Sequence, residues 1–220
     1  MKIYIADISP LCHQELFEKM LSFVSDDRKE KIKRSRKTLA QVQSLGAGLL
    51  LEYGLNQYGM TLIPKRQGLY TKIVSNQDGK PRVAEGNICF NLSHTGTYVA
   101  GIFAEEEVGI DIEQQKRSGQ KIAERFFTVE ENNYLDTVGT DQFTELWTRK
   151  ESYVKAVGKG LRIPLRSFSV LEDTMKGEET FYLRTWKREG YSLSVCGKQP
   201  ISTEPSEIEF DVMFGADPVF

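Results

Sequence analysis

The order of strand-like and helix-like segments repeats once along the chain, and this repeat constrains the fold more than any single motif. Each half begins with a strand-like segment, continues with amphipathic helices and closes with short strands. Helices are expected at 13–24, 39–58 and 141–157. A further helix is expected to begin with a cap at Ser25 or Asp26. Strands are expected at 2–8, 88–93, 98–104, 108–113, 168–172, 180–186 and 191–196. The pattern predicts an α+β protein built from two halves.

The boundary between the halves is expected near residue 105. The predicted halves are 1–105 and 106–220, and 220 residues suffice for one large domain or two small ones. No residue-level repeat relates the halves, and no low-complexity linker separates them. We therefore expect the halves to pack tightly against each other.

Charge and cysteine content exclude several classes of protein. A net charge of −2 argues against binding to nucleic acids or membranes by bulk attraction. Asp7 interrupts the first apolar run, and no segment approaches the ~20 apolar residues of a membrane span. Cys12, Cys89 and Cys196 are widely spaced and form no zinc-ligand pattern. These features favour a cytoplasmic protein without zinc.

Two carboxylates alternate with isoleucines in the strand predicted at 108–113. Alternate side chains of a strand share a face, so Asp111 and Glu113 point one way while Ile110 and Ile112 point into the core. Neighbouring carboxylates repel unless a cation or a proton lies between them, and Mg²⁺ is a natural partner. A half-exposed strand with its acidic side chains in water is the alternative.

A second set of candidate residues lies on the helix predicted at 141–157. Glu151 lies at the edge of an apolar stripe, and Lys155 follows one turn later on the same side. Lys150 falls near the middle of the stripe, where a solvated lysine is unusual. The alternative is an ordinary Glu151–Lys155 surface pair that contributes only ~0.3–0.5 kcal/mol.

Ser93, His94 and a basic run at 28–37 are candidates for anion contacts. Ser93 and His94 stand in a predicted polar loop that extends to Gly96, and no Ser-His-Asp order supports a hydrolase. A structural or exposed histidine and a solvated helix face are the alternatives. Together, carboxylates for a metal, a helix lysine and basic groups for phosphate are the components of phosphoryl-type transfer.

Four segments carry a more specific signal, namely Phe90–Gly96, Gly109–Glu113, Arg125–Phe127 and Leu146–Ala156. In order and spacing they resemble the Sfp-type 4′-phosphopantetheinyl transferases, and the resemblance extends to about residue 198. It implies two similar α/β halves related by pseudo-twofold symmetry, with the active site in the cleft between them. It also implies Mg²⁺-dependent transfer of 4′-phosphopantetheine from coenzyme A to a serine of an apo acyl or peptidyl carrier protein, releasing 3′,5′-ADP.

The resemblance further implies roles for individual residues. The implied magnesium ligands are Asp111, Glu113 and Glu151. The implied coenzyme A contacts are Arg28, Lys31, Lys80, Ser93, His94 and Lys155. In the reaction, Glu151 would take the serine proton or position metal and water, while Lys155 and His94 would stabilise the departing 3′,5′-ADP. Many members carry an arginine just before the Leu-Gly of the first long helix, where this chain has Val42.

The partner is expected to be an acidic carrier protein of fatty acid, polyketide or nonribosomal peptide synthesis. A basic segment after the metal strand is expected to border its binding site, and its residues are Lys116, Arg117, Lys121 and Arg125. The enzyme is expected to be a monomer, because two halves already form the cleft. The alternatives are an inactive homologue that binds carrier proteins and a nucleic-acid-binding module that uses the run at 28–37.

Overall fold

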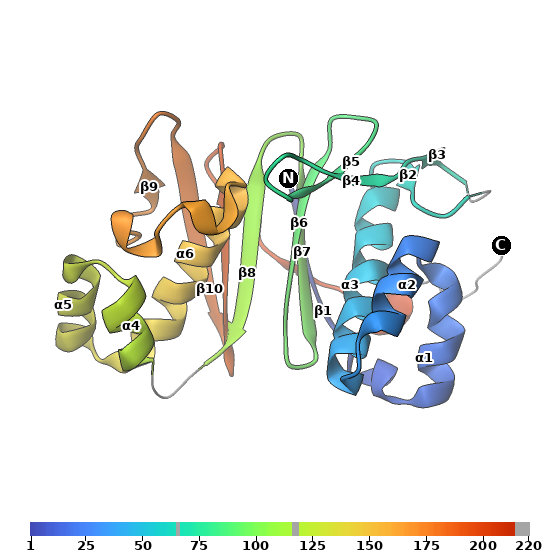
Figure 1. Ribbon diagram of the computed structural model, residues 1–220, viewed down its shortest axis with the longest axis horizontal. Coiled ribbons are helices and arrows are strands. Elements are labelled where there is room, and N and C mark those ends of the chain that lie inside the picture. Colours follow the sequence, from blue (N-terminus) through green and yellow to red (C-terminus); the bar gives the residue numbers. More distant parts are fainter. Residues whose placement is uncertain (65–66, 116–118, 214–220) are drawn as a thin grey trace.

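Two four-stranded sheets stand at the centre of the molecule, and helices lie on the outer side of each (Figure 1). The computed structural model describes residues 1–64, 67–115 and 119–213. The first sheet has the order β12-β1-β7-β6, with β1 (Lys2–Asp7), β6 (Cys89–Thr95), β7 (Tyr98–Ala104) and β12 (Ser206–Glu207). The second has the order β8-β11-β10-β9, with β8 (Val108–Gln114), β9 (Thr174–Met175), β10 (Phe181–Arg188) and β11 (Tyr191–Gly197).

Both sheets share a pattern of strand connection. In each, the first long strand pairs antiparallel with the last long strand, which pairs antiparallel with the strand before it. The mixed α+β class is therefore confirmed, and a twofold axis that relates the halves stays a prediction. Shorter pairs are β2 (Met60–Thr61) with β3 (Leu69–Tyr70), and β4 (Ile73–Ser75) with β5 (Pro81–Val83).

The first helical layer covers the outer face of the first sheet. It consists of α1 (Gln14–Met20), α2 (Asp26–Arg34) and α3 (Thr38–Asn56). The leucine-rich helix α3 packs on β7, and a Cβ at Gly54 would come within 2.0 Å of the Phe103 ring. Glycine at this position therefore lets the helix approach the sheet closely.

The second helical layer consists of α4 (Gln120–Phe126), α5 (Val129–Val138) and α6 (Phe143–Val157). Helix α5 begins with a capping box, in which Thr128 and Glu131 exchange side-chain and backbone hydrogen bonds. Helix α6 packs on β8 and β11 and ends at Gly158, whose φ of 75° is left-handed. None of the helices among the described residues is long and apolar enough to cross a membrane.

The inner faces of the two sheets share one apolar core. Ile3, Ile5 and Ile102 from the first sheet meet Ile110 and Ile112 from the second, and all five are at most 2 % exposed. The predicted tight packing of the halves is therefore correct. It also explains why the isoleucines of β8 point away from α6.

The neighbouring edges of the sheets, β6 and β8, are joined by side chains. The Ile110 backbone N–H donates to Asn91 Oδ1 at 2.9 Å, and the Gln114 N–H donates to Thr95 Oγ1 at 3.1 Å. Ser93 lies between these two positions on β6. Side chains of one half thus satisfy backbone groups of the other beside the candidate site.

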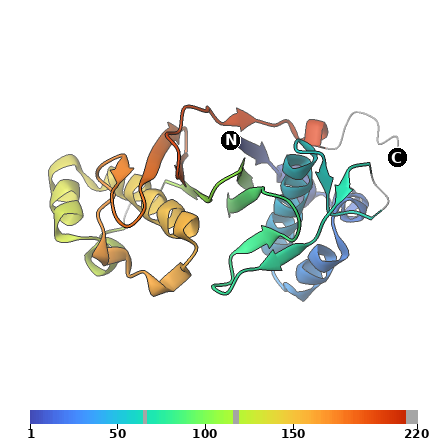
Figure 2. The same ribbon diagram turned by 90° about the horizontal axis from the view of Figure 1, so that it is seen from above.

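The last described segment returns to the first half. After β11 the chain crosses to the first sheet, where β12 pairs parallel with β1 (Figure 2). Ile208, Phe210 and Met213 then pack in the core beneath α3. Residues 206–213, which lie within the predicted second half 106–220, therefore pack with the first half.

Two local expectations were wrong. Ser93, His94 and Thr95 continue strand β6, and the predicted polar loop reduces to the turn at Gly96. The segment 168–172 is not a strand, and the short strand β9 lies just beyond it. The other predicted strands and helices lie close to their expected positions.

Candidate active site

Asp111 connects the two halves through a single buried oxygen. Its Oδ1 accepts hydrogen bonds from Ser93 Oγ at 2.8 Å and from Lys155 Nζ at 2.6 Å. Its Oδ2 is buried and has no hydrogen-bond partner among the described residues. A buried, partnerless carboxylate oxygen is costly, so a cation would stabilise this position.

Helix α6 brings Glu151 and Lys155 to this strand because β8 has no side chain at Gly109. A Cβ there would lie 2.1 Å from the Ser152 carbonyl oxygen and 2.4 Å from the Ala156 nitrogen. The Lys155 ammonium consequently reaches the Ile110 carbonyl at 3.1 Å and Ser93 Oγ at 3.2 Å. The structure thus brings together three predicted residues from three elements.

The Glu151 carboxylate lies in a setting that favours its protonated form. Burial raises its pKa, and the negative charges of Asp111 and Glu113 raise it further, while Lys155 opposes the shift. Glu151 has no hydrogen-bond or ion-pair partner among the described residues. A half-buried carboxylate with a raised pKa and no partner is well suited to accept a proton.

Asp111 and Glu113 are close enough to raise the pKa of Glu151, but the three predicted magnesium ligands do not form a ready-made metal site. Within the described residues, no group of three or more acidic, histidine or cysteine side chains is arranged to hold a metal ion. The all-oxygen donor set and the partnerless Oδ2 of Asp111 nevertheless suit a hard divalent cation. The residues present therefore fit Mg²⁺.

Cationic side chains lie on the first-half side of the same site. Although the His94 side chain is exposed, nearby protein displaces part of its solvent and lowers its pKa, and the charges of Lys155 and Lys31 lower it further. The pKa of Lys31 is lowered by burial and then by Arg28. Because the charges of Lys155 and Lys31 both act on His94, these predicted phosphate contacts from α6, α2 and β6 lie near one another. The site is thus acidic at β8 and cationic toward α2.

Arg28 is half-buried against helix α3. A Cβ at Gly48 would come within 2.9 Å of its Cγ, and burial lowers the pKa of its guanidinium. Neither Arg28 nor Lys31 has an ion-pair partner among the described residues. Both cations are therefore available for an anionic ligand.

Lys80 occupies a different place from the other predicted phosphate contacts. Its side chain is only 6 % exposed, and its ammonium lies 2.6 Å from Glu107 Oε2. It also donates to the carbonyls of Val108 and Ala156, each at 3.0 Å. In this conformation all three N–H groups are used within the protein.

Val42 does not line the site. It is 2 % exposed in the core beneath α3, so an arginine there would have to be buried. The next residue, Gln43, instead reaches the turn after β6, where it donates to the Gly96 carbonyl at 2.9 Å. The departure from the family pattern therefore falls at a core position.

Sequence reasoning missed the partner of Lys150. This lysine is fully buried in an ion pair with Glu131 at 2.8 Å and donates to the carbonyls of Leu165 and Phe168, each at 2.7 Å. Its position in the apolar stripe was the signal, but its partner lies on another helix. Lys150 is thus a structural residue beneath the site.

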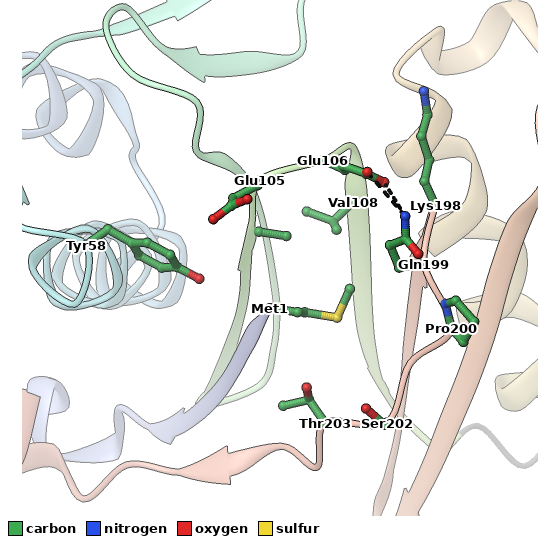
Figure 3. Close-up of a pocket in the computed structure, with 11 residues that line it drawn as sticks. Met1, Tyr58, Glu105, Glu106, Val108, Lys198, Gln199, Pro200, Ser202 and Thr203 are labelled. Atoms are coloured by element: carbon green, nitrogen blue, oxygen red, sulfur yellow. Dashed lines mark hydrogen bonds between the residues drawn. The ribbon is translucent and has the colours of Figure 1, made fainter.

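A separate hollow of about 430 Å³ lies between the β7–β8 turn and the segment 198–203 (Figure 3). Glu106 at this turn accepts hydrogen bonds from Gln199, and Tyr58 lies at the opposite wall. None of the predicted catalytic, metal or coenzyme A residues lines it. The hollow is therefore distinct from the candidate site.

Acidic and cationic side chains that face each other between two α/β units are typical of enzymes that transfer phosphate-linked groups. The chain is a transferase of this class. The profile of the "4'-phosphopantetheinyl transferase superfamily" matches residues 107–201, which include β8 and α6.

Relatives extend the similarity over most of the chain. The 4'-phosphopantetheinyl transferases ffp of Bacillus subtilis and Sfp of Bacillus subtilis (strain 168) are each 34% identical, over 91% of this chain and 93% of their own. The 4'-phosphopantetheinyl transferase gsp of Aneurinibacillus migulanus is 34% identical, over 83% of this chain and 80% of its own. The chain therefore belongs to the 4′-phosphopantetheinyl transferases, as a member of the Sfp type.

Proposed function

We propose that this enzyme transfers the 4′-phosphopantetheine group of coenzyme A to a serine of an apo acyl or peptidyl carrier protein, with Mg²⁺ as its metal. The observation that carries the proposal is the contact of Asp111 with Ser93 and Lys155. It supplies an acidic and a cationic group at one point where both halves meet. A pyrophosphate with a divalent cation has this charge pattern.

The cationic side chains are suited to hold the phosphates of coenzyme A. Arg28 and Lys31 would contact the 3′-phosphate, and Ser93, His94 and Lys155 the pyrophosphate. The side chain of Lys155 is 27 % exposed, so an incoming phosphate can compete with Asp111 for its ammonium. Charge-assisted hydrogen bonds of this kind give both affinity and orientation.

Asp111, Glu113 and Glu151 would hold Mg²⁺, which when bound neutralises negative charge on the pyrophosphate. Glu151 would take the proton of the carrier serine, directly or through a water, because its carboxylate makes no hydrogen bond or ion pair among the described residues. The serine oxygen bonds to the β-phosphorus as the bond from that phosphorus to the bridging oxygen breaks. The departing 3′,5′-ADP keeps the bridging oxygen, and Lys155 and His94 donate to it.

Helix α4 is the proposed border of the carrier site. Lys121 and Arg125 lie on it, Arg125 over the Phe126 ring at 5.0 Å. Lys116 and Arg117, which belong to the same prediction, lie outside the described residues. We propose that the enzyme acts as a monomer in the cytoplasm.

The test is mass spectrometry of an apo carrier protein incubated with coenzyme A and the enzyme, with and without Mg²⁺. We expect the mass of one phosphopantetheine to be added only with Mg²⁺, and none to be added to a carrier whose serine is replaced by alanine. An unmodified carrier that another transferase does modify would overturn the proposal. Carrier binding without modification would instead support the inactive homologue.

The nucleic-acid alternative is not favoured, because the residues of α2 that it would use include Arg28 and Lys31 beside the transferase site. Lys29 and Lys33 on the same helix pair with Asp26 and Glu30. The helix is therefore of mixed charge and not a uniformly basic face.

A further inference from the structure

Lys80 belongs to an arm of the first half that reaches the end of helix α6. The arm is the β4–β5 hairpin, and its turn is held by Asn76 Oδ1, which accepts from the Asp78 and Lys80 backbone N–H groups at 3.0 and 2.8 Å. Gly79 in this turn has a φ of 86°. The turn thereby aims the lysine side chain at the second half.

The Lys80 ammonium joins three segments at one point. Glu107 comes from the β7–β8 turn, the Val108 carbonyl begins β8, and the Ala156 carbonyl belongs to the last turn of α6. A carbonyl in the last turn of a helix lacks an intrahelical partner, and a lysine is a favourable one. Lys80 thus fixes the end of α6 against the start of β8.

The stem of Lys80 runs directly past the helix terminus. A Cβ at Gly158 would lie 2.9 Å from Lys80 Cδ, so the left-handed glycine leaves the space through which the side chain passes. Lys155, which contacts Asp111, immediately precedes Ala156 in the chain. A shift of this turn would therefore move the Lys155 ammonium and the neighbouring Glu151.

We propose that Lys80 is a positioning residue for the transfer reaction and not a phosphate contact. Its buried ammonium holds the last turn of α6, and with it Lys155 and Glu151, in register with Asp111. The inference rests on the proposed roles of these three residues in transfer. It accounts for a lysine whose three N–H groups are all directed into the protein.

The two roles of Lys80 predict different kinetics. A positioning residue affects the reacting geometry, so Lys80→Met should lower kcat by roughly 10- to 100-fold and leave the KM for coenzyme A nearly unchanged. A phosphate contact would instead show its loss mainly in KM. Amide hydrogen exchange at Gly158, whose N–H is bonded to Val154 at 2.9 Å, should become faster in the variant.

Glu107→Gln provides a second test that keeps the lysine. If Lys80 positions α6, loss of its counter-charge should lower kcat in the same direction as Lys80→Met. If Lys80 binds phosphate, Glu107→Gln should release the ammonium and leave kcat unchanged or tighten coenzyme A binding. Arg162→Met is the matched control, because it removes an exposed ion pair between the same arm and the segment after α6, at 2.7 Å from Asp78. Its kinetics should equal those of wild type.

Three results would overturn the inference: a rise of roughly tenfold or more in KM with unchanged kcat for Lys80→Met, wild-type kinetics in that variant, or unchanged kcat in Glu107→Gln. The last result decides the matter even if Lys80→Met fails to fold. An inactive wild-type enzyme would instead count against the proposed function itself.

Discussion

Glu151 is the residue whose chemistry depends most on its surroundings. Its raised pKa arises from burial and from the carboxylates of β8, and its side chain makes no hydrogen bond or ion pair within the described residues. The first property suits a base, and the second suits a metal ligand. Substitution by glutamine separates the two, because it preserves shape while removing charge and basicity.

Glu151→Gln should lower the transfer rate by about 100-fold or more without unfolding the protein. The rate is measured by carrier modification, the fold by thermal unfolding and metal binding by Mn²⁺ titration. Retained metal binding with lost turnover supports the role as base, and loss of both supports the role as ligand. Survival of activity in Glu151→Gln and Asp111→Ala alike would contradict the proposed metal-centred site.

His94 should make coenzyme A binding dependent on pH. Its pKa in the free enzyme is lowered, and a bound phosphate would raise it, so affinity should increase as pH falls from the bound pKa toward the free pKa. His94→Gln should weaken binding by roughly 10- to 150-fold and flatten this dependence, which calorimetry across pH measures. The exposed His13, replaced in the same way, controls for titration of coenzyme A itself. Equal pH profiles for the two variants would remove His94 from the site.

Gly109 sets the distance between α6 and β8. Gly109→Ala places a Cβ 2.1 Å from a helix carbonyl oxygen, so the helix must move away. We expect a loss of about 1–3 kcal/mol in the free energy of unfolding and a lower transfer rate. Denaturant unfolding and a carrier assay measure both. Gly177→Ala is the control, because its Cβ would meet an atom only at 3.7 Å. A fully active Gly109→Ala enzyme would show that the site tolerates a shift of α6.

The buried pair of Lys150 and Glu131 stabilises the support beneath the site. Both side chains are 0 % exposed, so removal of one charge leaves the other buried and unpaired. Lys150→Met should cost about 3–5 kcal/mol in urea unfolding, and Glu131→Leu combined with it should cost less than the sum of the single changes. Lys33→Met removes an exposed pair and should cost at most about 1 kcal/mol. A similar loss in both lysine variants would contradict this role.

Buried cations of α6 explain why the strand predicted at 168–172 does not form. Residues 168–172 include apolar side chains typical of a strand. However, Lys150 donates a hydrogen bond to the Phe168 carbonyl, and Arg149 donates to those of Val170 and Glu172. The Val170 N–H donates to Glu131. These backbone groups are therefore unavailable for strand pairing. Local periodicity cannot show this, since the buried partners come from two other elements.

The sequence predicted local geometry near the candidate site where a single element determines it. Strand alternation correctly placed Asp111 on the face opposite Ile110, since Asp111 contacts Lys155 of α6 while Ile110 packs in the core between the sheets. Lys80 was assigned to phosphate from the resemblance alone, and only the folded structure shows that its donors are used by Glu107 and two carbonyls. Such long-range contacts leave no trace in local sequence patterns.

On the scale of the whole molecule, the last described segment ties the halves together. Strand β12 has only two residues, too few for a periodic signal, yet it adds an edge to the first sheet. Together with the shared apolar core, it joins the two halves. Ligand binding between them should therefore be visible in global unfolding.

Coenzyme A and Mg²⁺ together should raise the melting temperature more than the sum of their separate effects. Coenzyme A would contact cations of α2 and β6, and its pyrophosphate would complete the surroundings of a metal held by β8 and α6. A ligand at 100 times its Kd stabilises the folded state by about 2.7 kcal/mol, which scanning calorimetry detects readily. The excess over additivity measures the coupling between metal and pyrophosphate.

Two changes separate the contributions to this coupling. Asp111→Asn should keep a shift with coenzyme A alone and lose the increment from Mg²⁺, because the amide removes the charge beside the partnerless oxygen. Dephospho-coenzyme A, which lacks the 3′-phosphate, should bind more weakly but retain that increment, since its pyrophosphate is intact. Strictly additive shifts, or a Mg²⁺ increment that persists in Asp111→Asn, would show that metal and pyrophosphate do not meet at Asp111. The metal would then have to be sought away from the junction of β6, β8 and α6.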